Sequence, residues 1–386
     1  MSNRALAGVA LVLASLGACE HRDAAAPTPI KFLHTFGREE TELFNATMAE
    51  RGIAVESSLV PFARGQQVIG EILRTGTSCP DLIRIDATWL PGLMTELLPA
   101  PQPLAALDWT PEAAALVVIE PFAGETTPRW WAAPQSVDGL VVVRDRRLPA
   151  PSSPSIDDLV TAARTHRAQP QGYPLGVRVD GYWLVPWLRA EGGELEARQG
   201  IDGDGAERAV ARFAALFGDV AAPPPPAGTE AVDELRRWNA GELAYWVTGP
   251  WQLGAVRDRD RIAVSPLARA PRGGQLLVVP KCARRPADGW KLAAELVDPA
   301  VEARFADAFG TVPTRTSALA ATTTPLARAL YDALKVAEPL PRDPRTPLLF
   351  DDLNPALAAV IAHDATPDEA IAGVRRAWHR LAGGAQ

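Results

Sequence analysis

The chain has 386 residues, of which 47% are hydrophobic and 22% are charged. This length exceeds what one hydrophobic core usually organises, so it predicts two domains of ordinary globular composition. The formal net charge of -7 argues against a nucleic-acid-binding protein, because such proteins carry a basic stripe or patch. We therefore expect no nucleic-acid partner.

The N-terminal residues predict export from the cytoplasm. Arg4 precedes an apolar run over residues 5–16, which has the length of a signal-peptide core and is too short to span a bilayer as a helix. The run ends in Leu-Gly-Ala-Cys, which resembles the lipobox of bacterial lipoproteins. That resemblance implies a signal peptide over residues 1–18 and diacylation of Cys19, which would anchor the protein to a bacterial membrane outside the cytoplasm, in the periplasm or at the cell surface. An ordinary signal-peptidase site is the alternative.

Residues 19–28 are rich in alanine and include Pro27, so they predict a tether between the lipid and the folded body. Cys79 and Cys282 remain after Cys19, and in an oxidising compartment they could form one disulfide. Two buried free thiols are the alternative. Neither cysteine has the spacing of a metal ligand and the histidines are scattered, so we expect no metal site and no cofactor.

The first part of the mature chain alternates strands and helices. Apolar periodicity predicts strands at residues 30–34, 53–60 and 81–85, with helices at residues 39–51 and 66–74. This alternation predicts an α/β sheet covered on both faces, with ligands beyond the carboxyl ends of its strands. Asp86 and Trp89 follow the third strand and are therefore candidates for ligand contact. The alternative for Asp86 is the N-cap of a helix.

Further helices are expected at residues 182–188, 206–217 and 231–239. Tyr182 and Trp183 lie on the first of these, where an aromatic ring belongs to a core more often than to a ligand platform. A strand at residues 243–247 follows the third helix, with Glu242 before it and Trp246 on it. Gly249 and Pro250 then stop the strand.

Trp251 comes directly after this Gly-Pro turn, where a scaffold displays a side chain instead of packing it. The alternative is a core tryptophan. A strand at residues 261–267, a glycine-led strand at residues 276–279, and helices at residues 288–297 and 299–309 follow, and the tail through residue 381 is expected to be helical. The Gly-Gly before residue 275 allows close backbone approach or a hairpin turn.

Several of these segments resemble the family 1 extracellular solute-binding proteins, the maltose-type receptors of ABC importers. The matching motifs are Asn-x-Gly-Glu-x-Ala followed by Gly-Pro-Trp at residues 239–251, Pro-Asp-Leu-Ile at residues 80–83, the proline-ended strand before residue 136, and Gly-Thr-Val-Pro-Thr-Arg at residues 310–315. The resemblance runs in order from Ile30 to about Arg315.

This resemblance implies a two-lobe fold of the periplasmic-binding-protein type, each lobe a mixed sheet flanked by helices, joined by about three hinge crossings. It assigns residues 29–137 and 265–312 to the N-terminal lobe, and residues 138–264 and 313–386 to the C-terminal lobe. The first crossing is expected at residues 136–139, with Asp138 facing the cleft. A surface aspartate in a loop is the alternative for that residue.

The implied function is capture of a disaccharide or oligosaccharide by hinge closure, and its delivery to ABC permease subunits by a monomeric receptor. Indole rings suit the apolar face of a sugar and carboxylates suit its hydroxyl groups. Glu242 could instead be a solvated acid. The expected ligand-binding residues are Asp86, Trp89, Asp138, Tyr182, Trp183, Glu242, Trp246 and Trp251.

Other functions are weaker candidates. A polyamine or another small solute on the same fold is the first, since acidic residues also suit a cation. A secreted glycoside hydrolase is the second, but no pair of carboxylates is fixed at a defined separation and no Gly-x-Ser-x-Gly elbow occurs. A receptor devoted to signalling or adhesion is the third. We therefore expect a binding protein and not an enzyme.

Overall fold

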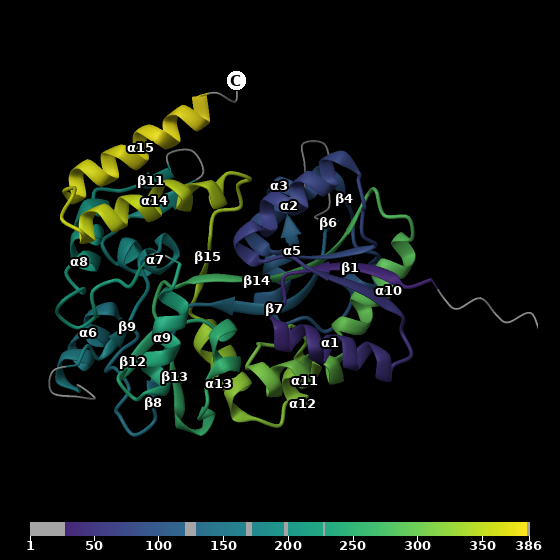
Figure 1. The fold of residues 1–386 in the computed structure, drawn as a ribbon, viewed down its shortest axis with the longest axis horizontal. Helices are drawn as coiled ribbons and strands as arrows, with labels where there is room; N and C mark the ends of the chain where they lie inside the picture. The colour runs from purple at the N-terminus through teal and green to yellow at the C-terminus, as the bar shows by residue number, and fades with distance from the viewer. Residues whose placement is uncertain (1–27, 120–128, 167–171, 197–199, 227, 384–386) are drawn as a thin grey trace, which may run out of the picture.

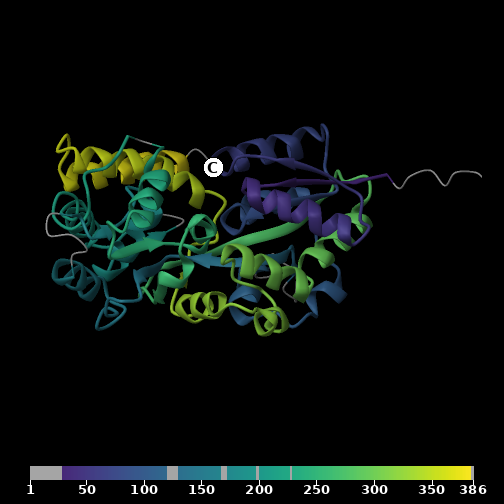
Figure 2. The same ribbon diagram turned by 60° about the horizontal axis from the view of Figure 1, so that its bottom comes forward.

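The computed structural model describes residues 28–119, 129–166, 172–196, 200–226 and 228–383. They form two lobes that lie side by side, each built on its own β-sheet (Figure 1, Figure 2). The sequence-based expectations for the signal peptide, for Cys19 and for nearly all of the tether fall outside these residues. In the part of the chain that is described, no helix combines the length and apolarity needed to cross a membrane.

The N-terminal lobe contains a seven-stranded sheet with the path β15-β14-β3-β1-β2, to which β4 and β7 add by pairing with β14. Strands β1, β2 and β3 are parallel, whereas β14 is antiparallel to β3 and to β7. The strand bounds are β1 Ile30–His34, β2 Val55–Leu59, β3 Leu82–Asp86, β4 Leu97–Leu98, β7 Ala133–Gly139, β14 Pro271–Pro280 and β15 Glu338–Pro339.

Both faces of this sheet are covered, as the sequence predicts for alternating strands and helices. Successive residues along a strand face opposite sides of the sheet. Leu276 and Leu277 accordingly belong to different hydrophobic clusters. The covering elements are α1 Arg38–Glu50, α2 Phe62–Thr75, α3 Leu90–Leu93, α4 Gln102–Ala105, α5 Pro111–Val117, α10 Pro286–Leu296, α11 Pro299–Phe309 and α12 Thr316–Ala321. A short ribbon joins β5 Val118–Ile119 to β6 Arg129–Trp130.

The C-terminal lobe is built on a four-stranded sheet in the order β13-β8-β12-β9. Its strands are β8 Val141–Asp145, β9 Leu175–Gly176, β12 Tyr245–Thr248 and β13 Ile262–Ser265, and a separate ribbon pairs β10 Glu194–Glu196 with β11 Gly200–Asp202. The helices are α6 Ile156–Thr165, α7 Gly181–Ala190, α8 Ala206–Ala214, α9 Glu230–Asn239, α13 Pro325–Leu334, α14 Thr346–Ile361 and α15 Pro367–Gly383. Short 3-10 helices lie at η3 Pro250–Ala255 and η4 Arg259–Arg261.

The two sheets are connected where β7 leads into β8 and where β13 leads into β14. The first connection turns at Gly139, which has φ +154° and a backbone that lies against Pro271 O. A third segment approaches the same region, because Val312 pairs with Val137 before the chain continues into α12 and α13. Strand β15 then pairs with the start of β14.

Cys79 and Cys282 form a disulfide with a Cα–Cα distance of 5.9 Å. It joins the segment before β3 to the segment after β14, which are 203 residues apart in the chain. Of the two alternatives left open by the sequence, the structure therefore contains the bonded one. The bond lies in the N-terminal lobe and links two segments whose strands are already paired.

Two local expectations differ from the structure. The region after Asp86 is not one helix but the 3-10 helices η1 Ala87–Trp89 and η2 Met94–Glu96 separated by α3, which has Pro91 in its first turn. The Gly-Gly at residues 273–274 is not a hairpin turn but the interior of β14, paired with β7. A Cβ on Gly274 would lie 2.4 Å from Ser136 O, so close strand packing explains why this position holds glycine.

Candidate functional site

Asp86 lies at the carboxyl end of β3, where the parallel strands of the N-terminal lobe end. Its Oδ1 accepts hydrogen bonds from Thr88 N at 2.8 Å and from the Thr88 hydroxyl at 2.6 Å. Its Oδ2 accepts a bond from Gln275 Nε2 at 3.1 Å. The carboxylate therefore caps η1, as the alternative interpretation predicts, and one oxygen also faces the neighbouring strand.

Asp138 lies on β7, on the other side of β14 from Asp86. Its Oδ2 is 3.5 Å from Gln275 Nε2, so one amide nitrogen lies between the two carboxyl groups. Gly273 is the partner of Asp138 in the β7–β14 register, and a Cβ at that position would lie 2.8 Å from Asp138 Oδ1. Glycine is therefore what allows the Asp138 carboxyl group to lie against β14.

The environment of these carboxyl groups disfavours two negative charges. Burial and the negative charge of Asp86 raise the pKa of Asp138 to about 7. Burial also raises the pKa of Asp86, although the hydrogen bonds from Thr88 and Gln275 oppose this. The buried Arg84 guanidinium lowers both pKa values by its positive charge. Near neutral pH the pair therefore binds a proton readily, which is a common property of ligand sites.

Aromatic rings from the C-terminal lobe lie next to these carboxyl groups. Tyr182, on the first turn of α7, donates a hydrogen bond to Pro271 O at 3.3 Å. Its ring centroid lies 6.3 Å from that of Trp251. The Trp251 side chain is 44% exposed at the start of η3, so the structure excludes the core alternative for this residue. Trp183 packs edge-on against Trp251 at 6.1 Å but is buried, and its indole donates to Val247 O.

Three of the expected ligand residues lie elsewhere or are covered. Trp246 is completely buried on β12, next to Trp238, and has no surface for a ligand. Glu242 lies before β12, at the end opposite Trp251, and forms ion pairs with Arg236 and Arg237. Trp89 is 5% exposed beneath Phe62, whose ring lies 5.1 Å away.

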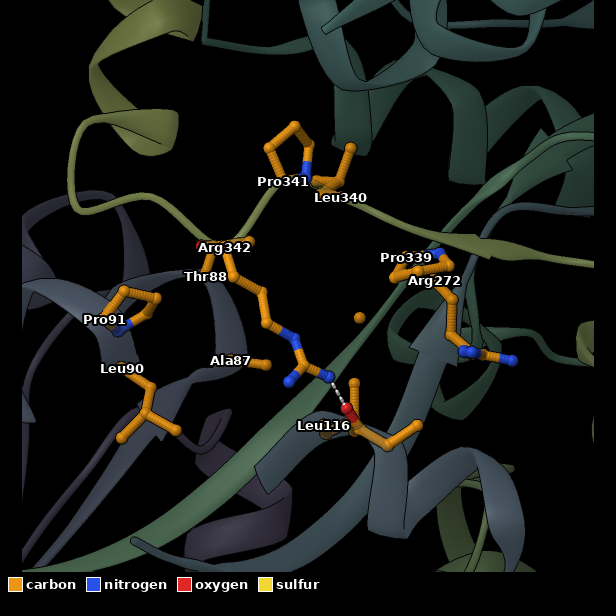
Figure 3. A pocket seen from close by; sticks show the side chains of 12 residues that line it. Ala87, Thr88, Leu90, Pro91, Leu116, Arg272, Pro339, Leu340, Pro341 and Arg342 are labelled. Carbon is orange, nitrogen blue, oxygen red and sulfur yellow. Dashed lines mark hydrogen bonds between the residues drawn. The ribbon is translucent and has the colours of Figure 1, made fainter. Parts of the chain in front are cut away.

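A recess with about 500 Å³ of empty space, including its open mouth, lies next to the end of β3 and to Gly273, the register partner of Asp138. Its lining consists of Ala87, Thr88, Leu90, Pro91, Ala115 and Leu116, Arg272 and Gly273 of β14, and the segment 339–342 (Figure 3). Arg342 reaches across from that segment and donates to Ala115 O. The recess thus brings together chain segments that are far apart in the sequence.

Sequence reasoning missed Gln275, Phe62 and Arg342. Gln275 had a usable signal, because it follows the glycine pair that lets β14 pack closely. Phe62 is 54% exposed at the start of α2, three residues after β2 ends. Arg342 had no local signal, because its place depends on how the C-terminal segment folds back. The described residues contain no group of three or more His, Cys, Asp or Glu that could hold a metal ion.

Comparison with known proteins decides the family. The profile of the bacterial extracellular solute-binding proteins matches residues 43–329. The chain belongs to this family. This extracellular solute-binding protein is accordingly a binding protein and not an enzyme. No curated protein sequence matches it.

Solved structures with the same fold include three receptors. The GacH receptor of Streptomyces glaucescens GLA.O is 21% identical with a TM-score of 0.79, and the match covers 92% of this chain and 98% of that one. Maltose-bound MalE3 of T. maritima is 18% identical with a TM-score of 0.77, covering 91% and 100%. The maltotriose-binding protein of Thermus thermophilus is 18% identical with a TM-score of 0.72, covering 90% and 99%. The solute-binding protein therefore has the two-lobe fold that the sequence predicts.

Proposed function

We propose that this solute-binding protein captures a disaccharide or oligosaccharide between its two lobes and delivers it to the permease of an ABC importer. The observation that carries the proposal is the half-exposed Trp251 ring. It contacts the Tyr182 ring, and Tyr182 in turn lies close to the carboxyl groups of Asp138 and Asp86. Three proteins of the same fold support it, since their structures contain acarbose, maltose and maltotriose respectively.

The chemistry of a sugar ring matches this arrangement. A pyranose has an apolar face of C–H bonds, which can pack on the Trp251 indole, and a rim of hydroxyl groups that donate hydrogen bonds. Asp86 and Asp138 offer carboxyl oxygens as acceptors. Asp86 belongs to the N-terminal sheet and Trp251 follows a strand of the C-terminal sheet. A sugar that touches both would therefore link the lobes and favour their closed arrangement.

The lobe boundaries proposed from the sequence are residues 29–137 with 265–312 and residues 138–264 with 313–386. Two short elements of the last range, α12 and β15, belong to the N-terminal lobe in the structure, so we propose these boundaries for the remaining residues. Closure would then occur about the connections near residues 138 and 265. Four of the expected ligand residues are proposed only to position other residues, because their side chains are buried or form ion pairs: Trp89, Trp183, Glu242 and Trp246. Direct contacts are proposed for Trp251, Tyr182, Asp86 and Asp138.

The binding proposal is tested by isothermal titration of the purified chain without its lipid, using maltose, maltotriose and, as a non-sugar solute, spermidine. We expect a carbohydrate to bind and Trp251→Ala to weaken that binding by about 10-fold or more, since a buried aromatic contact contributes about 1–2 kcal/mol. Val232→Ala, which trims a 72% exposed side chain on α9, is the control and should leave affinity unchanged. Binding of spermidine alone, unaffected by Trp251→Ala, would contradict the proposal.

We also propose that Cys19 carries the lipid that anchors the mature protein to a bacterial membrane outside the cytoplasm, and that the protein is a monomer. The apolar run before Cys19 and the lipobox-like residues support the lipid anchor, whereas the monomer is implied only by the resemblance to the solute receptors. Cys19→Ser should move the protein from the membrane fraction to the soluble fraction and abolish labelling by a radioactive fatty acid. Labelling that persists in Cys19→Ser would overturn the anchor, and a dimer in sedimentation of the lipid-free chain would overturn the monomer.

A further inference from the structure

Asp86, Asp138 and Gln275, which we call the acceptor cluster, have more hydrogen-bond acceptors than donors. Asp86 receives three hydrogen bonds from Thr88 and Gln275. Asp138 receives one long bond, from Gln275 Nε2 at 3.5 Å. A buried carboxylate usually accepts several bonds. Asp138 is partly exposed, so water or a bound molecule can supply its remaining donors.

Gln275 provides an independent observation that points to a ligand. Its side chain is 8% exposed, and its Oε1 is buried without a hydrogen-bond partner. Reversing the amide would place its oxygen 3.1 Å from the carboxyl oxygen of Asp86, which is unfavourable whenever Asp86 is ionised. A buried acceptor without a donor destabilises the folded chain, and a ligand that supplies a donor removes this penalty. Both Gln275 and Asp138 therefore lack donors, and they lie next to each other.

The carboxyl groups of the cluster also lack an ion-pair partner. Among the described residues, none forms an ion pair with Asp86 or Asp138. The nearest buried cation, Arg84, directs its Nε to Gln135 and its Nη1 to Thr35, and its guanidinium lies over the Phe36 ring. Arg84 thus affects the cluster through its field and leaves the carboxyl oxygens open to another cation.

We propose that the acceptor cluster binds a protonated amine, so that the preferred ligand is a carbohydrate in which an amino group replaces a hydroxyl. This inference rests on the proposed function and specifies its substrate class. An ammonium group has three N–H donors and no acceptor, which complements a site made of acceptors. A hydroxyl group offers one donor and leaves the negative charge uncompensated. Charge-assisted bonds are about twice as strong as neutral ones.

The titration of the pair agrees with this geometry. A cation next to Asp138 stabilises its ionised form, so the pKa of about 7 should fall when the amine binds. Amine binding should then weaken as pH falls below that value, because the proton competes with the ammonium. Asp86 and Arg84 on β3 act on the charge of Asp138, and Tyr182 on α7 is close enough for Asp138 to raise its pKa. Other elements packed against β7 carry Arg272 on β14, Glu112 on α5 and Tyr331 on α13.

The inference is tested with matched ligands in isothermal titration. The set consists of maltose, maltose with an amino group in place of a hydroxyl at C2 or C6, the N-acetylated forms of both amino sugars, and spermidine. N-acetylation keeps the added nitrogen and removes its charge. We expect at least one amino sugar to bind about 10- to 100-fold more tightly than maltose, the range that one hydrogen-bonded charge provides, and its N-acetylated form to lose that gain.

Asp138→Asn should abolish the preference for the amino sugar while maltose affinity changes less. Asp364→Asn, which removes an exposed aspartate outside the site, is the control for net charge. Thermal unfolding of both variants confirms that they fold, and we expect Asp138→Asn to be no less stable because it removes a buried charge.

Equal binding of maltose and every amino sugar would overturn the inference and leave the proposed function intact. A preference that survives Asp138→Asn would also overturn it. Spermidine binding that requires Asp138, with no binding of any carbohydrate, would support the amine site but overturn the proposed carbohydrate function. Absence of binding by every amine up to about 10 mM, a limit that corresponds to less than about 3 kcal/mol, would overturn the inference.

Discussion

Glu302, outside the ligand site, shows how burial determines the charge state of a single side chain. It is 3% exposed on α11 and accepts hydrogen bonds from the backbone N–H groups of Thr314 and Arg315, both at 3.1 Å. The Thr314 hydroxyl has one hydrogen and donates it to Pro134 O at 2.9 Å. Its oxygen also contacts Glu302 Oε1, and this contact is satisfied when a protonated Glu302 donates to Thr314. Burial raises the pKa of Glu302 to about 8, in agreement with that arrangement.

The protonated state of Glu302 makes stability depend on pH. Because its pKa is about 8 in the folded chain and 4.5 for a glutamate in water, the folded protein holds more protons between these values. The contribution of Glu302 is therefore complete below about pH 4.5 and is lost as pH rises towards 8, by at most about 1.4 kcal/mol per pH unit. Glu302→Gln keeps a neutral group that can donate to Thr314 and accept from the backbone.

We expect the free energy of unfolding of Glu302→Gln to exceed that of the wild type at about pH 8 by up to about 3 kcal/mol, and the two to converge near pH 5. Urea unfolding at several pH values measures this. Glu56→Gln, at an exposed position on β2, should follow the wild-type curve. Parallel curves for Glu302→Gln and the wild type would show that Glu302 is ionised throughout.

Residue types alone foresee only part of the site. Trp251 is predictable, because a Gly-Pro turn after an apolar strand displays the next side chain. Trp246 carries the same aromatic signal but lies inside β12, and its complete burial depends on the helices that cover the sheet. The role of Gln275 depends on a register in which it pairs with both Asp86 and Ser136. No single-sequence pattern gives that register.

At the level of elements, local pattern predicts where strands and helices occur but not how they are ordered. The alternating apolar residues of β1 and the amphipathic α2 are predicted close to their observed bounds, because both signals are local. The place of β14 between β3 and β7 is not local, since it pairs segments more than 130 residues apart. The acceptor cluster exists only because these three strands are neighbours.

The segment after Asp86 is a second case in which the local sequence pattern does not predict the observed structure. An apolar pattern from residue 88 predicts one helix, whereas Pro91 lies where the chain divides into short helical turns. Proline in the first turn is compatible with a helix, so the sequence alone does not predict the break. The Asp86 carboxylate then caps η1 with one oxygen, while its other oxygen accepts from Gln275. A helix cap and a ligand contact are therefore compatible roles for this residue.

At the scale of the whole molecule, the two lobes meet where β7 passes into β8, and Arg189 fastens the C-terminal lobe to this region. Arg189 lies on α7, is 2% exposed, and donates to the carbonyl groups of Arg269 and Pro339. Arg269 lies just before β14, and Pro339 lies in β15. Charge-assisted bonds of this kind are strong when buried. Arg189 thus ties α7 to the start of β14 and to β15, so of the two connections near residues 138 and 265 we expect the β7–β8 turn to rotate more freely.

Gly139 at this turn offers a test of hinge closure. A Cβ added there would lie 2.5 Å from Pro271 O and 2.9 Å from the Leu334 side chain, so Gly139→Ala should push β7 away from β14. Gly52→Ala is the matched control, because Gly52 also has a positive φ, of +68°, but a Cβ there would meet nothing within 4 Å. We expect a loss of about 2–3 kcal/mol of stability for Gly139→Ala against about 1 kcal/mol for Gly52→Ala.

The hinge role predicts an effect on binding beyond this loss of stability. If only the closed arrangement binds the ligand on both lobes, a variant that lowers the closed population about 10-fold lowers affinity about 10-fold without changing any contact residue. Gly139→Ala should therefore bind carbohydrate more weakly and show a larger radius of gyration in X-ray scattering at the same sub-saturating ligand concentration, whereas Gly52→Ala should match the wild type in both. Unchanged affinity in a destabilised but folded Gly139→Ala would mean that the β7–β8 turn holds the lobes together without governing their closure.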